Sequence, residues 1–182
     1  MRAVVIYESM YGNTHEIADT IGSGLRTAGW QISIVPVAAA GSAVLTAADL
    51  VVVGGPTHAH GMTRPGTREG AAEAARKPGS GLTLEADALG AGLRDWLDSL
   101  GHYQVRAAAF DTRIAGPSLL TGRASRGIAR ALRHHGFEVL AEPESFLVSR
   151  ENHILPGERE RARQWGADLA AAMTAARTRP TH

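Results

Sequence analysis

A short segment near the start of the chain combines hydroxyl groups with glycine, between an apolar run and a helical pattern. Its residues are Ser9, Met10, Tyr11, Gly12, Asn13 and Thr14. The first amides of a helix have no partners within the helix and carry partial positive charge, so such a position attracts anions. The hydroxyls of Ser9 and Thr14 add donors, and Gly12 allows close approach to the backbone. The segment therefore predicts a site for a terminal phosphate.

The alternative is an ordinary turn into a helix. On that interpretation Asn13 is the N-cap, and Glu16 three residues later completes a capping box.

A second polar segment, residues 54–62, follows another apolar run. His58 and His60 alternate in it, so in an extended chain they point in opposite directions. With no carboxylate nearby in sequence, we expect no metal. We expect a histidine in a binding site or, alternatively, one histidine packed beneath the loop and the other solvated. The candidate binding residues are Pro56, Thr57, His58, Ala59, His60 and Gly61.

A third segment supplies Asp111, Thr112 and Arg113. Asp111 has an alternative role as a turn residue that bonds its own backbone. Farther along, arginines recur at spacings of three, four and three, which places them on one face of a helix. That stripe is either a solvated face or a docking face for an acidic partner or a nucleotide phosphate. Its residues are Arg123, Arg126, Arg130 and Arg133.

Apolar runs alternate with helical patterns along the chain. Strands are predicted at residues 3–7, 32–37, 50–53 and 105–110, and a fifth at 137–140 and 145–148 with an interruption around Pro143. The pattern indicates an α/β fold with a doubly wound parallel sheet and helices on both faces. Ligands of such sheets bind outside the carboxyl ends of the strands, so the three polar segments should converge there.

Four helices are predicted, and one of them contains Ile128 and Leu132 and ends near residues 134–136. The first buries Ile17, Ile21, Leu25 and Ala28; a second covers residues 93–100; and the last opens at Pro156 and buries Ala162, Trp165, Leu169, Ala172 and Met173. The glycine-rich stretch at residues 77–92 has no clear period, and we interpret it as an insertion or loop.

The composition narrows the class of protein. A length of 182 residues with 44% hydrophobic residues fits one domain, expected at residues 1–176 with a flexible tail at 177–182. The net charge of +1 argues against a nucleic-acid binder, and the absence of cysteine excludes disulfides and thiolate chemistry. We find no signal peptide and no apolar run of about 20 residues, so we expect a cytoplasmic protein that does not bind membranes.

The first two polar segments resemble known motifs. Residues 9–14 resemble the flavodoxin phosphate loop Ser/Thr-x-Thr-Gly-x-Thr, with Tyr11 replacing the middle threonine. Residues 56–62 are similar to the Pro-Thr-x-x-x-Gly-Met/Asn loop of flavodoxin-like quinone reductases. The resemblance implies a flavodoxin-like, five-stranded sheet of order 2-1-3-4-5 that binds flavin mononucleotide (FMN). It also implies that the backbone of residues 57–61 faces the flavin ring and that residues 111–113 contact the ring edge.

The departures from the family pattern bear on function. The usual tryptophan of the second loop and the usual tyrosine of the third have no counterpart, so the outer face of the ring is expected to be open. The expected function is electron transfer or FMN-dependent oxidoreduction, with no side chain assigned as catalytic. Partners would be a redox protein or a small acceptor such as a quinone, or a haem precursor, and a homo-oligomer is compatible with the family. The alternative is a binding or scaffold module that has lost FMN.

Overall fold

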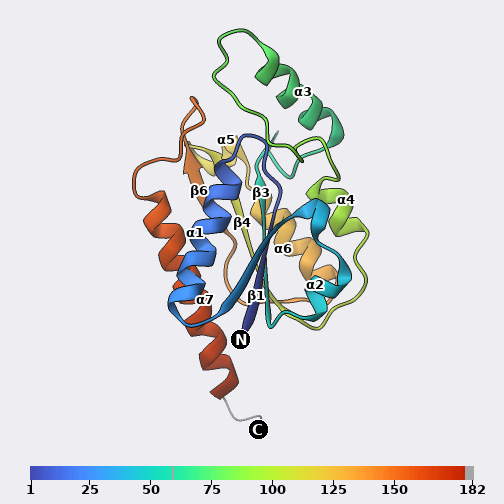
Figure 1. Ribbon diagram of the computed structural model, residues 1–182, viewed down its shortest axis with the longest axis vertical. Coiled ribbons are helices and arrows are strands. Elements are labelled where there is room, and N and C mark those ends of the chain that lie inside the picture. Colours follow the sequence, from blue (N-terminus) through green and yellow to red (C-terminus); the bar gives the residue numbers. More distant parts are fainter. Residues whose placement is uncertain (59, 179–182) are drawn as a thin grey trace.

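Short, mainly apolar runs form one parallel sheet, seen in the centre of Figure 1. The computed structural model describes residues 1–58 and 60–178. The strand order is β2-β1-β3-β4-β5, and β6 also pairs with β4. This order confirms the predicted flavodoxin-like sheet, with the fifth position shared by two short strands on either side of Pro143. The strands are β1 (Arg2–Tyr7), β2 (Gln31–Pro36), β3 (Leu50–Pro56), β4 (Arg106–Ile114), β5 (Glu138–Val139) and β6 (Glu144–Val148).

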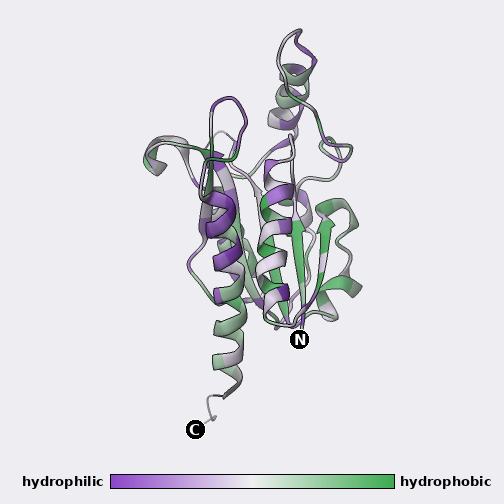
Figure 2. Cartoon of the chain, turned by 60° about the vertical axis from the view of Figure 1, so that its left-hand side comes forward, coloured by the Kyte–Doolittle hydropathy of each residue, from purple (hydrophilic) through white to green (hydrophobic). Residues whose placement is uncertain are grey.

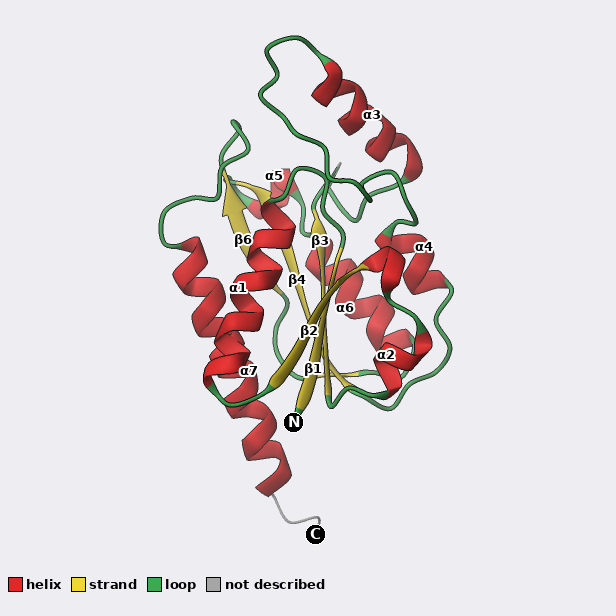
Figure 3. Ribbon diagram, in the orientation of Figure 1, coloured by secondary structure: helices red, strands yellow, loops and turns green. Residues whose placement is uncertain are grey.

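The sheet separates two apolar layers, as expected for parallel strands that are buried on both faces. Alternate residues of β1 enter different layers: Val5 packs in one and Ile6 in the other. Helices α1 (Asn13–Thr27) and α7 (Glu158–Thr178) cover the first layer. Helices α2 (Ser42–Thr46), α4 (Leu93–Asp98) and α6 (Ala124–His134) cover the second, together with the 3-10 turn η1 (Val37–Ala39). The doubly wound arrangement predicted from the sequence is confirmed (Figure 3).

The register aligns the carboxyl ends of the strands at one edge. Tyr7 at the end of β1 lies opposite Gly54 of β3, and Gly54 lies opposite Phe110 of β4. A Cβ atom added to Gly54 would lie 2.1 Å from Cζ of Phe110, so only glycine fits here. This tight contact brings the loop after β3 close to the loop after β4.

Several local predictions are wrong in detail. Helix α1 begins at Asn13 itself, and its N-cap is Gly12, without a side-chain cap, so the predicted capping box is absent. Ala28 and Ala172 are exposed, whereas Ile17, Ile21 and Leu25 on α1 are buried as predicted. The last helix begins at Glu158 rather than Pro156, and residues 179–182 lie outside the described part of the chain.

A helix that the sequence did not predict, α3 (Pro65–Arg76), stands beyond the carboxyl edge of the sheet (Figures 1 and 3). The chain then passes through residues 77–92 without a helix or strand, as predicted, and returns to α4. The backbone of this loop is tied to the first polar segment, because the Glu85 amide donates to the Met10 carbonyl at 3.0 Å. Helix α3 and this loop therefore form a wall above the sheet edge.

The hydropathy of the elements follows their position. In Figure 2 the strands are coloured mostly as hydrophobic, while the helices carry many hydrophilic residues. No helix in the described part of the chain is both long and apolar enough to cross a membrane.

Candidate functional site

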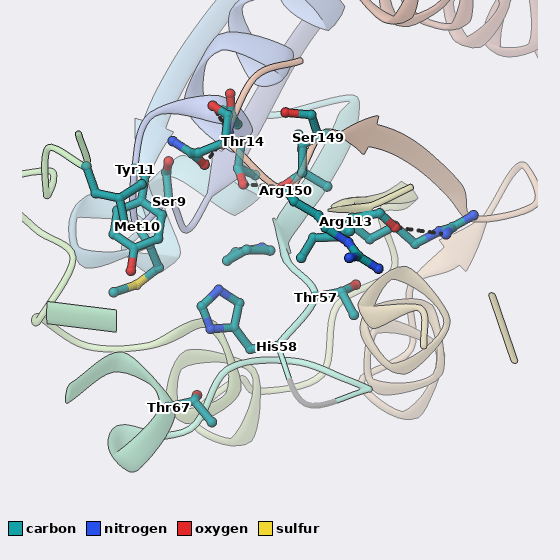
Figure 4. Close-up of a pocket in the computed structure, with 17 residues that line it drawn as sticks. Ser9, Met10, Tyr11, Thr14, Thr57, His58, Thr67, Arg113, Ser149 and Arg150 are labelled. Atoms are coloured by element: carbon teal, nitrogen blue, oxygen red, sulfur yellow. Dashed lines mark hydrogen bonds between the residues drawn. The ribbon is translucent and has the colours of Figure 1, made fainter. Parts of the chain in front are cut away.

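A cavity of about 500 Å³ lies at the carboxyl edge of the sheet, where the loops after β1, β3, β4 and β6 meet (Figure 4). Its volume falls within the range of small-molecule sites, about 300–1,000 Å³. The structure brings many of the sequence-predicted residues together on its lining: Ser9, Met10, Tyr11, Asn13, Thr14, Pro56, Thr57, His58, Thr112 and Arg113. The predicted convergence of the three polar segments is therefore present in the fold.

The first residues of α1, beside the cavity, have backbone amides without a hydrogen-bond acceptor. Gly12 adopts the left-handed conformation, φ 93°, and its amide donates to Ser9 Oγ at 3.1 Å. After Gly12, the first amide along the chain that donates a hydrogen bond is that of Glu16, to the Gly12 carbonyl. The amides of Asn13, Thr14 and His15 thus have no acceptor among the described residues. These free donors and the helix dipole create the electrostatic environment that an anion requires.

The hydroxyl of Thr14 joins the first loop to the third. Its Oγ1 lies 2.7 Å from Oγ1 of Thr112, and both side chains are buried. A hydroxyl both donates and accepts, so Thr14 can accept from Thr112 and direct its own proton elsewhere.

Tyr11 connects the first loop to the wall formed by α3. Its hydroxyl donates to the Ala71 carbonyl at 2.7 Å, and Met10 packs with Ala71 beneath it. From the wall itself, Thr67 and Leu82 reach the lining. The Tyr11 ring is therefore held in a fixed orientation at the cavity side.

The second loop is a tight turn that carries one histidine inward. His58 and Gly61 exchange two backbone hydrogen bonds, of 2.9 and 3.0 Å. The His58 ring points into the cavity in Figure 4. Its burial lowers its pKa, and the nearby Glu8 carboxylate opposes that shift, so the ring is neutral at pH 7.

The other predicted residues of the second loop lie elsewhere. His60 has a positive φ of 71° and is exposed, and neither it nor Gly61 lines the cavity. One histidine is therefore turned inward and the other is solvated. Ala59 lies outside the described residues.

Asp111, the remaining predicted residue of the third segment, does not line the cavity. Its side chain is fully buried away from the cavity and accepts the Ser125 amide at 2.7 Å, near the start of α6. Burial raises the pKa of Asp111, and the hydrogen bond from the Ser125 amide opposes that shift. Asp111 therefore anchors α6 to β4. Its neighbours Thr112 and Arg113 line the cavity, and Arg113 donates to the Gly116 carbonyl at 2.8 Å.

A fourth loop, after β6, completes the lining and was missed in the sequence. It contributes Ser149, Arg150 and Asn152. Asn13 Nδ2 donates to Asn152 Oδ1 at 2.6 Å, which fixes this loop to the start of α1. The signal that could have revealed it is its position directly after a parallel strand, at the edge where ligands bind.

The charged groups of the lining are of one sign. It contains Arg113, Arg150 and the titratable His58, and no Asp or Glu among the described residues. Within the described part of the chain no group of three or more potential metal ligands is present.

The arginine stripe lies outside the cavity. Arg126, Arg130 and Arg133 are exposed along α6, as a solvated face would be. Arg123 instead donates to Ser145 Oγ at 2.9 Å and to the Pro143 carbonyl.

Comparisons with known proteins agree with this architecture. Residues 4–65 match the family model described as a flavodoxin domain. A flavodoxin from the domain Archaea superimposes with a TM-score of 0.65 at 20% identity, covering 96% of this chain and 99% of its own. Flavodoxin 1 from Bacillus cereus gives 0.63 at 21% identity, covering 96% and 98%. No curated protein sequence matches the chain.

A larger protein contains the same fold as one part. Rubredoxin oxygen:oxidoreductase from Desulfovibrio gigas gives a TM-score of 0.61 at 17% identity, with 98% of this chain covering 37% of that one. The flavodoxin-like resemblance inferred from the sequence is confirmed, and the fold is that of flavodoxins.

Proposed function

We propose that this protein binds FMN and acts in electron transfer, either as an FMN-dependent oxidoreductase or as an electron carrier. The observation that carries the proposal is the cavity at the strand ends beside three free amides of α1. Flavodoxins share the fold. The bound flavin supplies the redox chemistry, and the protein supplies binding, orientation and the electrostatic environment.

The residues present fit the phosphate of FMN. The amides of Asn13, Thr14 and His15 would hold it, with the hydroxyls of Ser9 and Thr14 as further donors. Because no carboxylate among the described residues lines the cavity, a bound dianion meets no like charge from them. The Asn13–Asn152 hydrogen bond keeps the start of α1 in place.

The other side of the cavity fits a flat aromatic ring. Tyr11 and His58 would lie along it, and the backbone of the turn at Thr57 would face its edge, beside Thr112. Apolar side chains, including Met10, Leu82 and Val148, would exclude water from the ring. Ile114 is 48% exposed at the lining, which leaves room there for a redox protein or a small acceptor such as a quinone.

The test is an absorbance spectrum of the purified protein, followed by titration with FMN and, in parallel, with riboflavin. We expect a flavin band or saturable binding in the micromolar range or tighter, with FMN bound more tightly than riboflavin because only FMN carries the phosphate. Absence of binding at high FMN would overturn the proposal. It would favour a flavodoxin-fold module without flavin.

A further inference from the structure

Arg150 is a cationic residue of the cavity whose guanidinium has no assigned role. It lies in the loop after β6, lines the cavity and is exposed. In Figure 4 its side chain extends from that loop toward Thr57 of the second loop, away from Thr14. No described residue forms a hydrogen bond or ion pair with it.

Arg113, the other arginine of the lining, is already engaged. Its Nη1 donates to the Gly116 carbonyl at 2.8 Å and to Thr121 Oγ1 at 3.0 Å. The Nε atom of Arg113 has no hydrogen-bond partner but is buried, whereas no donor of the exposed Arg150 has a partner among the described residues, so the whole guanidinium of Arg150 remains available to a ligand.

Three carboxylates on or beside the segments that form the cavity are bonded to other partners. Glu8 accepts the Leu93 amide at 2.7 Å and the Thr63 hydroxyl. Glu85 accepts a hydrogen bond of 3.1 Å from His15 Nδ1, and Asp111 accepts the Ser125 amide. Glu151, next to Arg150 in the chain, is exposed to solvent; the hydrogen bond from Ser149 and, less strongly, the charge of Arg150 lower its pKa, without an ion pair between the two side chains. None of these carboxylates lines the cavity, so negative charge that develops on a ligand there is stabilised rather than repelled.

We propose that Arg150 contacts the flavin ring and binds its reduced form more tightly than its oxidised form. The inference rests on the proposed function. Uptake of two electrons and one proton gives the ring one negative charge that the neutral, oxidised ring lacks. A free guanidinium on the ring side of the cavity interacts with that charge, so the reduction potential of the bound flavin rises. Such a site favours a reductase that accepts an electron pair.

The test is the midpoint potential of bound FMN in the Arg150→Gln variant, measured by reductive titration with dithionite and a reference dye at about pH 8. Because Arg150 is exposed, solvent screens its charge, and we expect a loss of about tenfold in the preference for reduced flavin. For a two-electron couple this equals a potential about 30 mV lower. Arg150→Lys keeps the charge and should lose less.

The matched control is Arg126→Gln, an exposed arginine on α6 that does not line the cavity. It removes the same charge from the protein and should leave the potential unchanged. An unchanged potential in Arg150→Gln, or an equal shift in the control, would overturn the assignment.

A second measurement distinguishes the ring from the phosphate. If Arg150→Gln weakens binding of oxidised FMN but not of riboflavin, the residue contacts the phosphate, and the proposal is overturned. Failure of the wild-type chain to bind any flavin would overturn the proposed function as well, whereas normal binding with an unchanged potential overturns only the role of Arg150.

Discussion

Replacement of Thr14 with Val tests the phosphate site through a single hydroxyl. The two side chains have nearly the same shape, and Thr14 is buried, so the variant changes polarity rather than packing. In the proposed complex Thr14 accepts from Thr112, 2.7 Å away, and donates to the phosphate. A hydrogen bond to a charged group contributes about 1.5–3 kcal/mol. We therefore expect FMN affinity to fall about 10- to 150-fold, since 1.4 kcal/mol is a factor of ten.

Thr14→Val also lowers the free energy of unfolding of the ligand-free protein. It leaves the buried Thr112 hydroxyl without its partner, which destabilises the fold by about 1–3 kcal/mol. Chemical denaturation of the ligand-free protein measures this cost separately, and titrations are then made at a temperature where the variant is folded.

Fluorescence titration with FMN and riboflavin is the assay. Loss of a hydrogen-bond donor to the phosphate weakens the binding of FMN and leaves the binding of riboflavin unchanged, because riboflavin has no phosphate. Thr20→Val is the matched control, because it removes a hydroxyl that bonds the Glu16 carbonyl at 2.8 Å on the same helix, outside the cavity. An unchanged FMN affinity in Thr14→Val, or an equal loss for both ligands, would refute a phosphate at the start of α1.

Two further predictions concern the sheet edge and the second loop. Gly54→Ala places a Cβ 2.1 Å from Phe110 Cζ and should lower the free energy of unfolding by about 1–3 kcal/mol, whereas Gly41→Ala, with open space around it, should not; equal urea midpoints would contradict the tight contact. The pKa of His58 is lowered from 6.5 in the folded protein, so the unfolded chain binds more protons and stability falls as pH drops through that value. Between about pH 7.5 and 5.5 the wild-type protein should therefore lose more stability than His58→Gln. If the melting temperatures of the two proteins fall equally over this pH range, burial of the His58 ring has no such effect.

The strands could be predicted because the pattern that specifies them is local. Val4, Val5 and Ile6 are buried whichever face of the sheet they meet, so a continuous apolar run predicts a strand of a parallel sheet. Once the strands are placed, the convergence of the polar loops follows from their shared direction. Helix α3 has no comparable signal: it contains two glycines, and its buried apolar residues are only Ala71 and Ala72.

The position of Asp111 could not be predicted, because the group that it bonds belongs to a separate element, helix α6, and no local sequence pattern links the two. A polar residue at a strand end faces either the ligand or a neighbouring helix, and the choice depends on which amide is free. Here the Ser125 amide of α6 donates a hydrogen bond to the Asp111 carboxylate. Asn13 illustrates the same limit: its residue type favours the N-cap position, yet the left-handed Gly12 is the N-cap of α1, and the Asn13 side chain donates to Asn152 instead.

Access to the cavity follows from which parts of its lining are exposed. Four lining residues are buried, so no other molecule can reach a bound ligand from their side of the cavity. They are Met10, Thr14, Pro56 and Thr112. The wall of α3 and residues 77–92 is fixed to the first loop by the hydrogen bonds of Tyr11 and Glu85. Ile114, the last residue of β4, and Arg150, in the loop after β6, are in contrast exposed lining residues. In the proposed complex with FMN, an electron donor or acceptor would therefore meet the ring on the side where Arg150 lies. Arg150, which we propose stabilises the reduced flavin, would then also contact the molecule that exchanges electrons with it.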